Sequence, residues 1–448
     1  MRYASFCLIL AAACTPPKTE VVVKEPQWDT AQRSPLSLGN PDRYFAATFD
    51  DDNRLYAAGW VGESDDQAMA VARFTADGAV DTSFGEGGIA RMNVAVGGKN
   101  GEVARGIVIQ STGHVVIAGP FEHAPTAAGD AAKDTDVAAV RFTEDGALDT
   151  SFGNGGIARL DLSTGVMDGT TLVADTSWGL TLAADDRLLI VAARVADGRK
   201  DTDFALVRLT AGGALDTSFG TNGVVTVDVA AGVDSPRQAI VTSDGKVVAC
   251  GYSKNAAGIT STVLFRVGTN GALDATFGTS GVVSAAPLAN VTEAYDVALV
   301  GGNLMTTGYG KKVAADKVDF LTAKFTADGA VVASHGTGGV LTLDLAGDDD
   351  RGRDIVALPK GGALAVGSGK LTSDNVDAMI VKLTADGAFD PSFGEGGKKL
   401  YDLGGPSDSF FSVAVSPDGT RAAVVGYMGA PTAGPGNDDG VILFLDLR

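Results

Sequence analysis

The chain has 448 residues, of which 45% are hydrophobic and 20% are charged, and its formal net charge is −20. This composition supports a buried core, while the negative charge argues against nucleic acid or an anionic membrane surface as the main partner. The length exceeds that of one ordinary domain unless the fold is a barrel or a repeat.

The first 13 residues, MRYASFCLILAAA, have a cationic start, a short apolar run and a small-residue end. This pattern predicts a secretory signal that is too short to cross a membrane. Cys14 follows directly and resembles the acylated cysteine of a bacterial lipoprotein, although Ala11 stands where such signals usually carry Leu. We therefore expect a signal peptide at 1–13 and a flexible tether at 14–32 beginning with lipidated Cys14. An ordinary signal that is cut nearby is the alternative.

One motif then recurs along the chain, first as VARFTADGAVDTSFGEGG from Val71 and last as IVKLTADGAFDPSFGEGG. Each copy carries one basic residue, and these residues are Arg73, Arg141, Arg208, Arg266, Lys324 and Lys382. A seventh copy, ILFLDLR, is cut short and has Phe444 at the basic position. Repetition at this interval indicates one structural unit used many times.

Each copy is preceded by two apolar runs around a polar turn, as in GIVIQSTGHVVIAG at 106–119, and each Gly-Gly is followed by another short run. Short apolar runs bounded by turn residues are typical of strands, so each unit has four. The sequence therefore predicts an all-β, seven-bladed β-propeller with four antiparallel strands per blade, spanning 33–448. The fourth strand follows only six copies, so we expect residues 34–38 to complete the last blade as an N-terminal closing strand.

Residues 203–223, DFALVRLTAGGALDTSFGTNG, resemble the delta-60 repeat, a motif of bacterial secreted, propeller-like proteins. The resemblance covers roughly residues 40–448. It implies the propeller fold and an exported location, and it brings no catalytic residues. The fifth copy departs from the pattern, with Val332 in place of the Asp and His335 in place of the Phe.

The loop between the third and fourth strands looks like a repeated site, but we interpret it as structural. Asp149 and Asp216 are expected to bond N–H groups of their own loops. One aromatic residue per copy is expected to plug the space between adjacent blades. These residues are Phe84, Phe152, Phe219, Phe277 and Phe393.

The segment KDTD occurs twice, at 133–136 and 200–203. Its carboxylates, Asp134, Asp136, Asp201 and Asp203, are weak candidates for a calcium site, because calcium prefers oxygen ligands. A solvated acidic loop is the simpler reading. We therefore expect no metal and no cofactor, with calcium as the alternative.

Counting back from each hairpin's glycine places Arg105, Arg237 and Arg353 at one equivalent position, with Phe45, Trp178, Ala294 and Phe411 in the other blades. The first strand of a propeller blade lines the central channel, so these side chains are expected near one mouth. Arginines and aromatic rings together favour an anionic or sugar-like ligand. In the alternative, the arginines pair with Asp350, Asp354 and Glu102.

Catalysis has little support, because only three histidines are present and no HExxH, GxSxG or paired-carboxylate motif appears. The sequence favours a monomeric, non-catalytic binding or scaffold protein of the cell envelope that presents a propeller face to a protein or glycan. We expect an outer-membrane or cell-surface lipoprotein that meets the membrane only through its lipid. An extracellular enzyme acting on a polymer and a calcium-stabilised adhesin are the alternatives.

Overall fold

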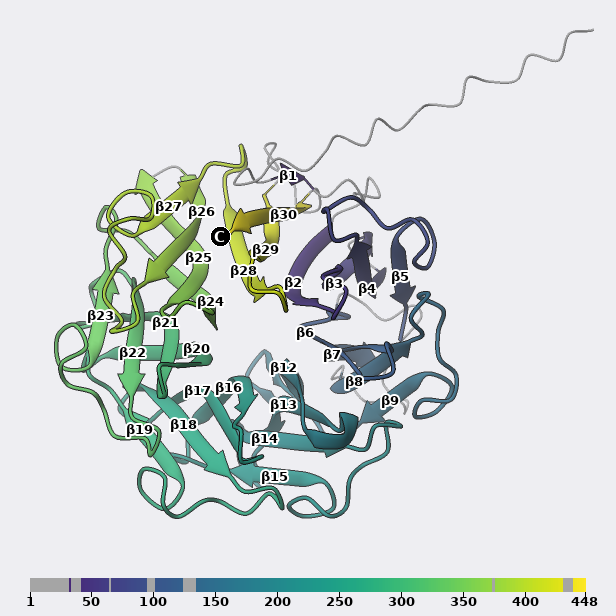
Figure 1. The fold of residues 1–448 in the computed structure, drawn as a ribbon. Coiled ribbons are helices and arrows are strands. Elements are labelled where there is room, and N and C mark those ends of the chain that lie inside the picture. Colours follow the sequence, from purple (N-terminus) through teal and green to yellow (C-terminus); the bar gives the residue numbers. More distant parts are fainter. Residues whose placement is uncertain are drawn as a thin grey trace, which may run out of the picture.

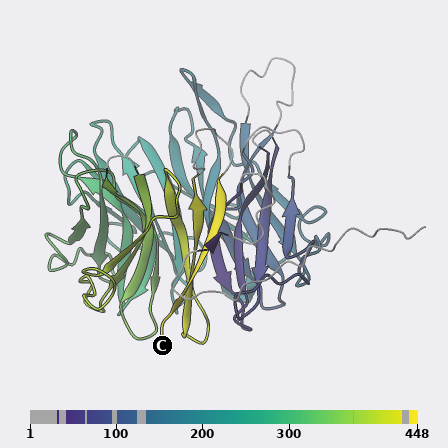
Figure 2. The same cartoon turned by 90° about the horizontal axis from the view of Figure 1, so that it is seen from above.

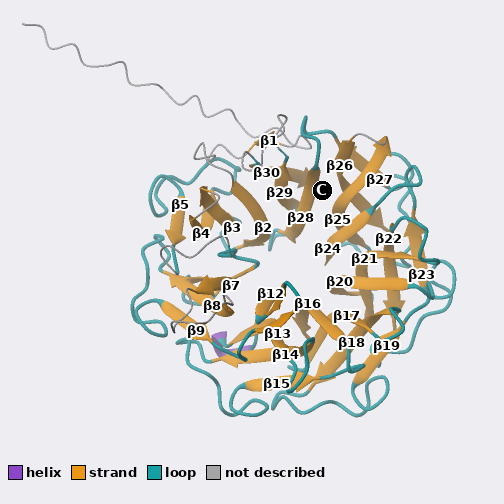
Figure 3. Cartoon of the chain, turned by 180° about the vertical axis from the view of Figure 1, so that it is seen from behind, coloured by secondary structure: helices purple, strands orange, loops and turns teal. Residues whose placement is uncertain are grey.

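The computed structural model describes residues 32–33, 42–63, 66–94, 101–123, 134–372, 375–429 and 438–448. Within these ranges the fold is all-β, with one short 3-10 helix, η1 (Ala184–Asp186). The sheets stand around a central opening as the blades of a β-propeller (Figure 1). Figure 2 shows the same ring from the side, and Figure 3 shows it from behind. No helix in the described part of the chain is long and apolar enough to cross a membrane.

Each blade is a group of four strands and is named here by its innermost strand. The β2 blade contains β2 (Asp42–Phe49), β3 (Leu55–Glu63), β4 (Asp66–Phe74) and β5 (Ile89–Met92). The β6 blade contains β6 (Gly106–Ile109), β7 (Val115–His123), β8 (Asp134–Phe142) and β9 (Ile157–Leu160). A small hairpin of β10 (Val166–Asp168) and β11 (Thr171–Val173) follows. The β12 blade contains β12 (Thr176–Leu182), β13 (Leu188–Val195), β14 (Thr202–Leu209) and β15 (Val224–Val227).

The next two blades share one parallel contact, between Thr260 and Val291. The first is the β16 blade, which contains β16 (Val233–Val241), β17 (Val247–Lys254), β18 (Thr260–Val267) and β19 (Val282–Ala285). The second is the β20 blade, which contains β20 (Val291–Val300), β21 (Asn303–Lys311), β22 (Asp319–Phe325) and β23 (Val340–Leu343). The β24 blade contains β24 (Arg351–Ala357), β25 (Ala363–Thr372), β26 (Asn375–Leu383) and β27 (Lys398–Tyr401). The β28 blade contains β28 (Asp408–Val415), β29 (Arg421–Met428), β30 (Asp439–Asp446) and β1 (Gln32–Arg33).

The core lies between blades rather than at one centre. One cluster joins Val137 and Ala139 of β8 to Leu188 and Ile190 of β13, for example. Because a neighbour covers each face, the strands read as continuous apolar runs in place of the alternating pattern of a half-exposed sheet.

The N-terminal strand β1 lies at the outer edge of the last blade, where Gln32 is opposite Ile442 and Arg33 is opposite Val441. The predicted closing segment, 34–38, lies outside the described residues. At the inner edge, the Ala47 N–H of β2 donates to the Ser412 Oγ of β28 over 3.2 Å. Segments from the two ends of the sequence are thus joined at two places.

Candidate functional site

The innermost strand of most blades contains one extra residue. In β2, Tyr44 is opposite Gly59 and Ala46 is opposite Ala58, so Phe45 has no partner across the sheet. The same β-bulge occurs in β12, β16, β20, β24 and β28. A bulge turns a side chain away from its regular direction. The residues at these bulges are Phe45, Trp178, Arg237, Tyr295, Arg353 and Phe411.

In five of the six blades with this bulge, the glycine that ends the sequence hairpin leaves room for the bulged backbone, whereas the β12 blade has Ala192 there. A Cβ on Gly59 would lie 1.8 Å from the carbonyl oxygen of Arg43, and a Cβ on Gly367 would lie 1.8 Å from that of Arg351. No other residue fits so close to the bulged backbone. The repeated glycine is therefore a local signal for the residue that enters the channel.

These side chains meet in a cavity of about 80 Å³ at the centre of the ring. All six residues predicted for the channel mouth line it: Phe45, Arg105, Trp178, Arg237, Arg353 and Phe411. Arg105, which directly precedes β6, has its Cζ 3.7 Å from the ring centre of Trp178 and 5.6 Å from that of Phe45. Their role in binding stays a prediction.

Cations and rings alternate around this central pocket, except where Phe411 and Phe45 meet with their ring centres 4.8 Å apart. Arg237 lies between Trp178 and Tyr295, with its Cζ 4.1 Å and 4.4 Å from the ring centres. Arg353 lies between Tyr295 and Phe411, at 4.9 Å and 5.2 Å. Each guanidinium therefore faces two negative ring faces.

The sequence placed Ala294 at this position in the β20 blade, and this is wrong. Ala294 is buried in the core, and Tyr295 lines the pocket. The reason is the turn between β20 and β21, which consists only of Gly301 and Gly302. Because this turn is short, counting the usual number of residues back from Gly308 reaches Ala294, one residue before Tyr295.

The alternative in which the arginines pair with local acids is also wrong. Asp354 accepts the Val413 N–H at 2.8 Å, Asp350 the Leu345 N–H at 2.7 Å and Glu102 the Val94 N–H at 2.7 Å. Among the described residues, no ion pair joins Arg105, Arg237 or Arg353 to a carboxylate.

The three arginines differ in how they are held. Arg237 donates to Ser235 Oγ at 2.7 Å and to the Pro236 carbonyl oxygen at 2.9 Å. Arg105 and Arg353 contact rings only, and the Nε of each of the three arginines is buried with no hydrogen-bond partner in the described part of the chain. Burial, then repulsion from Arg237 and Arg353, lowers the pKa of Arg105 to about 10. The charge of Arg105 is thus repelled by the two neighbouring cations.

Two acids and two phenols border the arginines. Asp296 accepts the Ile355 N–H at 2.9 Å, which ties the β20 blade to the β24 blade. Burial, and then the nearby Asp354, raises the pKa of Asp296 well above its usual value. The hydroxyls of Tyr295 and Tyr309 are 3.0 Å apart. Although burial favours a neutral phenol, Arg237 and Arg353 lower the pKa of Tyr295.

The repeated loop has structural contacts that fit its interpretation. Asp149 accepts the Ser151 N–H at 3.0 Å, and Asp216 accepts the Ser218 N–H at 3.1 Å. Each also pairs with the basic residue of its own copy, Arg141 Nε at 2.7 Å and Arg208 Nε at 2.8 Å. Sequence reasoning missed these pairs, because the loop folds back over eight residues.

The plugging aromatics are not all alike. Phe84, Phe152, Phe219 and Phe277 are fully buried, whereas Phe393 is only half-buried. His335, which replaces Phe in the fifth copy, is also buried, and its Nε2 lies 3.0 Å from Thr322 Oγ1.

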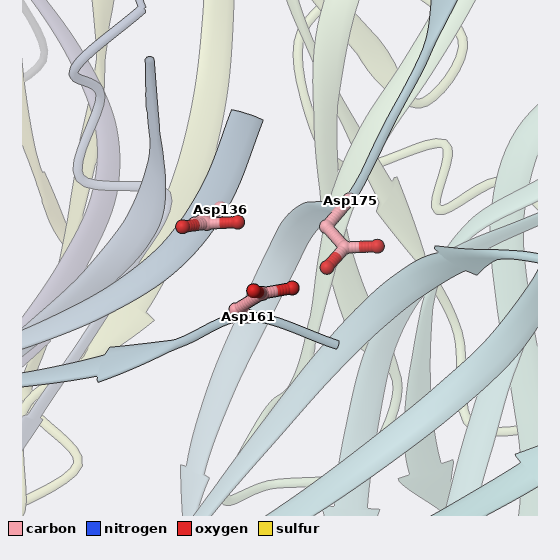
Figure 4. Close-up of side chains that lie close together, drawn as sticks. All are labelled: Asp136, Asp161 and Asp175. Carbon is pink, nitrogen blue, oxygen red and sulfur yellow. The ribbon is translucent and has the colours of Figure 1, made fainter. Parts of the chain in front are cut away.

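Two of the four acids proposed as weak metal candidates, Asp136 and Asp203, lie in separate clusters of three carboxyl groups. Asp136 lies with Asp161 and Asp175, and Figure 4 shows the three carboxyl groups side by side. Asp134 instead accepts the Gly165 N–H at 3.1 Å. Asp161 and Asp175 were missed, because they come from the chain between β9 and β12.

The second cluster contains Asp203, Asp228 and Asp234. In this cluster Arg199 takes the place of a metal cation. Its Nη2 lies 2.6 Å from Asp203 Oδ1, and its Nη1 lies 2.6 Å from Asp228 Oδ2. Its Nε also pairs with Asp201 at 2.7 Å. Arg199 therefore pairs with three carboxylates in or beside this cluster, Asp201, Asp203 and Asp228. Cys14 and residues 1–31 lie outside the described residues.

Comparison with known proteins supports the fold. The family model described as "Domain of unknown function (DUF5122) beta-propeller" matches residues 51–84, 110–152, 183–219, 242–277 and 364–393, so five segments of the chain are similar to a β-propeller repeat family. No curated protein matches the chain.

Solved structures with a similar fold are distant in sequence. A Dyadobacter fermentans protein of unknown function is 11% identical, over 94% of this chain and 99% of its own, with a TM-score of 0.49. An alpha-L-arabinanase of Penicillium chrysogenum is 12% identical, over 76% and 92%, with a TM-score of 0.42. The Hadza microbial sialidase Hz136 is 13% identical, over 85% and 73%, also with 0.42. Similarity at this level carries no information about activity.

Proposed function

We propose that this chain is a non-catalytic binding protein of the cell envelope that holds an anionic group of a protein or glycan in its central pocket. One observation carries the proposal: Arg105, Arg237 and Arg353 converge on that pocket without an ion-pair partner among the described residues. Three cations held together in partly buried positions favour an anion over a neutral ligand.

The size of the pocket limits what enters it. A volume of about 80 Å³ is close to that of a few water molecules. It suits a carboxylate, sulfate or phosphate group and excludes a whole sugar ring. We infer that the rest of the ligand stays outside, where Trp178 and Tyr295 offer ring faces for stacking.

The proposal extends to the architecture and the location. We propose seven blades in a closed ring, completed by an N-terminal strand, and a relationship to the delta-60 repeat. The pairing of β1 with β30 and the recurring DTSFG motif support this. We further propose export and lipid attachment at Cys14, for which the support is the arrangement of residues 1–14. A Cys14→Ser variant should then lose metabolic labelling by a fatty acid.

Calorimetric titration tests the binding site. Glucuronate, sulfate and phosphate should bind the wild-type chain, and glucose, which lacks the charge, should not. Replacing Arg105, Arg237 and Arg353 together by Gln should abolish binding while far-UV circular dichroism stays that of a β protein. Equal binding of glucuronate to the wild type and to this variant would exclude the pocket as the site.

A second candidate, an enzyme acting on an extracellular polymer, is favoured by one feature. Tyr295, with its lowered pKa, contacts Tyr309, and Glu293 lies beside Tyr309. A phenol that ionises easily next to cations is suited to nucleophilic attack or proton transfer. Release of reducing ends from uronic-acid polymers, lost in Tyr295→Phe, would support this candidate over pure binding.

A further inference from the structure

In six blades, the turn that follows the third strand lies against the neighbouring blade. We call these four-residue segments repeat turns; they are 75–78, 143–146, 210–213, 268–271, 326–329 and 384–387. Turn 210–213 contacts the β6 blade, where Arg141 Nη1 donates to the Ala211 carbonyl oxygen at 2.7 Å and the Gly153 N–H donates to that of Gly212 at 2.9 Å. A Cβ on Gly213 would lie 2.8 Å from the Phe152 ring.

The same contacts recur at other junctions. Arg266 donates to the Ala327 carbonyl oxygen at 2.7 Å, and Gly278 to that of Asp328 at 2.8 Å. Where the basic residue is Lys324, its Nζ reaches the carbonyl oxygen of Asp386 at 2.9 Å. A repeat turn is therefore bound by a cation, a glycine N–H and an aromatic or imidazole ring.

The junction between the β24 and β28 blades has the same cation, glycine and ring but is open. Lys382, Gly394 and Phe393 occupy these positions, and a cavity of about 440 Å³ lies against Lys382 and Phe393. The Lys382 side chain is 31% exposed there, compared with 12% for Arg141 at a junction that a repeat turn covers. Leu447 occupies the sequence position whose carbonyl oxygen, in a repeat turn, accepts the bond from the basic residue. Here that carbonyl oxygen accepts a hydrogen bond from Lys360 Nζ instead, at 3.1 Å.

The charge of this cavity suits an acidic turn. Its walls contain four cationic and two acidic side chains: Lys360, Lys382, Lys399, Arg448, Asp390 and Asp446. Four of the six repeat turns carry an Asp immediately before their glycine, at 77, 145, 328 and 386. An excess of cations therefore complements the residue that repeat turns present.

We propose that this cavity binds a glycine-containing, acidic turn of a partner polypeptide, in the manner in which the other junctions bind the repeat turns of this chain. Lys382 Nζ donates to a carbonyl oxygen of the turn, and its glycine packs on the ring of Phe393. The partner's turn would be bound as the repeat turns are bound at the other junctions. Hydrogen bonds to its backbone give affinity, and contact of its glycine with the ring gives selectivity for that residue.

A peptide with the sequence of residues 142–148, FTEDGAL, cyclised and labelled, is the probe. Fluorescence anisotropy with the full chain should show saturable binding. Lys382→Met and Phe393→Ala should each weaken binding about tenfold, because each removes one of the contacts that hold a seated turn. Lys312→Met, which alters an exposed lysine of another blade, is the control and should bind as the wild type does. A peptide with Val in place of its glycine should not bind, since a seated turn has no room for a Cβ.

Phe393 is half-buried, so Phe393→Ala should remain folded, and its circular dichroism is recorded beside the titration. Three results would overturn the proposal. The first is no binding up to about 1 mM peptide, and the second is binding that both variants leave unchanged. The third is a different occupant: inorganic phosphate whose binding needs Lys382, or self-association of the chain that Phe393→Ala abolishes, with no binding of the peptide.

Discussion

The guanidinium carbon of Arg105 lies 3.7 Å from the ring centre of Trp178, and among the described residues no carboxylate balances its charge. A ring face attracts a cation but leaves its charge uncompensated. With Arg237 and Arg353 nearby, the arrangement stores repulsion that an incoming anion relieves.

Arg105→Gln should therefore stabilise the ligand-free chain, by about 1 kcal/mol, because a buried like-charge contact is removed. The melting temperature should rise in low-salt buffer, and the further rise that sulfate causes in the wild type should disappear. Arg351→Gln is the control, because Arg351 lies on β24 two residues before Arg353 but pairs with Asp349 at 3.1 Å. A lower melting temperature for Arg105→Gln would show that ring contacts outweigh repulsion.

Tyr295 should ionise below the usual tyrosine range, because Arg237 and Arg353 lower its pKa in spite of burial. A titration followed by ultraviolet absorbance should show one tyrosine that ionises early. That step should be absent in Tyr295→Phe and present in Tyr401→Phe, which alters a distant tyrosine. If the early step survives in Tyr295→Phe, another residue is responsible.

The chain should be more stable at pH 5 than at pH 7.5. Burial raises the pKa of Asp175, Asp234, Asp350 and Asp408 to about 6, from a value near 3.8 in the unfolded chain. Between these values the folded state binds more protons than the unfolded state, so stability falls as pH rises through this range. Melting temperatures across this range test the sign, and Asp234→Asn should reduce the difference. A melting temperature that rises with pH would contradict the prediction.

Stability should fall again in stronger acid. The pKa of Asp348 and the pKa of Asp390 are each lowered to about 2. The largest cause is a hydrogen bond, from the Asp349 N–H to Asp348 and from Ser392 to Asp390. These two carboxyls stabilise the folded chain at pH values above their pKa in the unfolded chain. This stabilisation is lost as the pH falls through their pKa in the folded chain. The optimum is therefore expected near pH 4 to 5, between the two sets of values.

Gly59→Ala should destabilise the chain by about 3 kcal/mol or more, because its Cβ would overlap the carbonyl oxygen of Arg43. Gly212→Ala is the matched control, with its nearest contact at 4.0 Å, and should change stability by less than about 0.5 kcal/mol. Urea denaturation measures both. Equal effects would show that the bulge can relax.

Phe152 and Phe393 occupy the same motif position but should differ in energetic weight. Phe152→Ala should cost about 3–5 kcal/mol, since the side chain is fully buried between two blades. Phe393→Ala should cost about 1 kcal/mol, because its ring faces the open cavity. Comparable losses in denaturation would mean that the cavity closes in solution.

Much of the pocket was accessible from sequence because it depends on a local rule. In most blades a glycine of the second strand faces the bulge in the first, so residues such as Arg105 and Arg353 lie at a constant distance before that glycine. The rule failed for Tyr295, where the turn at Gly301 and Gly302 is short. Asp161 and Asp175 were not found, because their approach to Asp136 depends on how neighbouring segments pack.

The sequence by itself determined the repeating unit, its hairpins and the glycine-dependent bulge, since each of these depends on residues close together in the chain. Only the tertiary structure decided that cations and rings alternate around one small pocket, and that Phe393 faces a cavity while Phe152 is buried. These features arise where different blades meet, between residues about as far apart as one repeat or more. Such contacts form only when the blades assemble around the ring, so no local pattern encodes them.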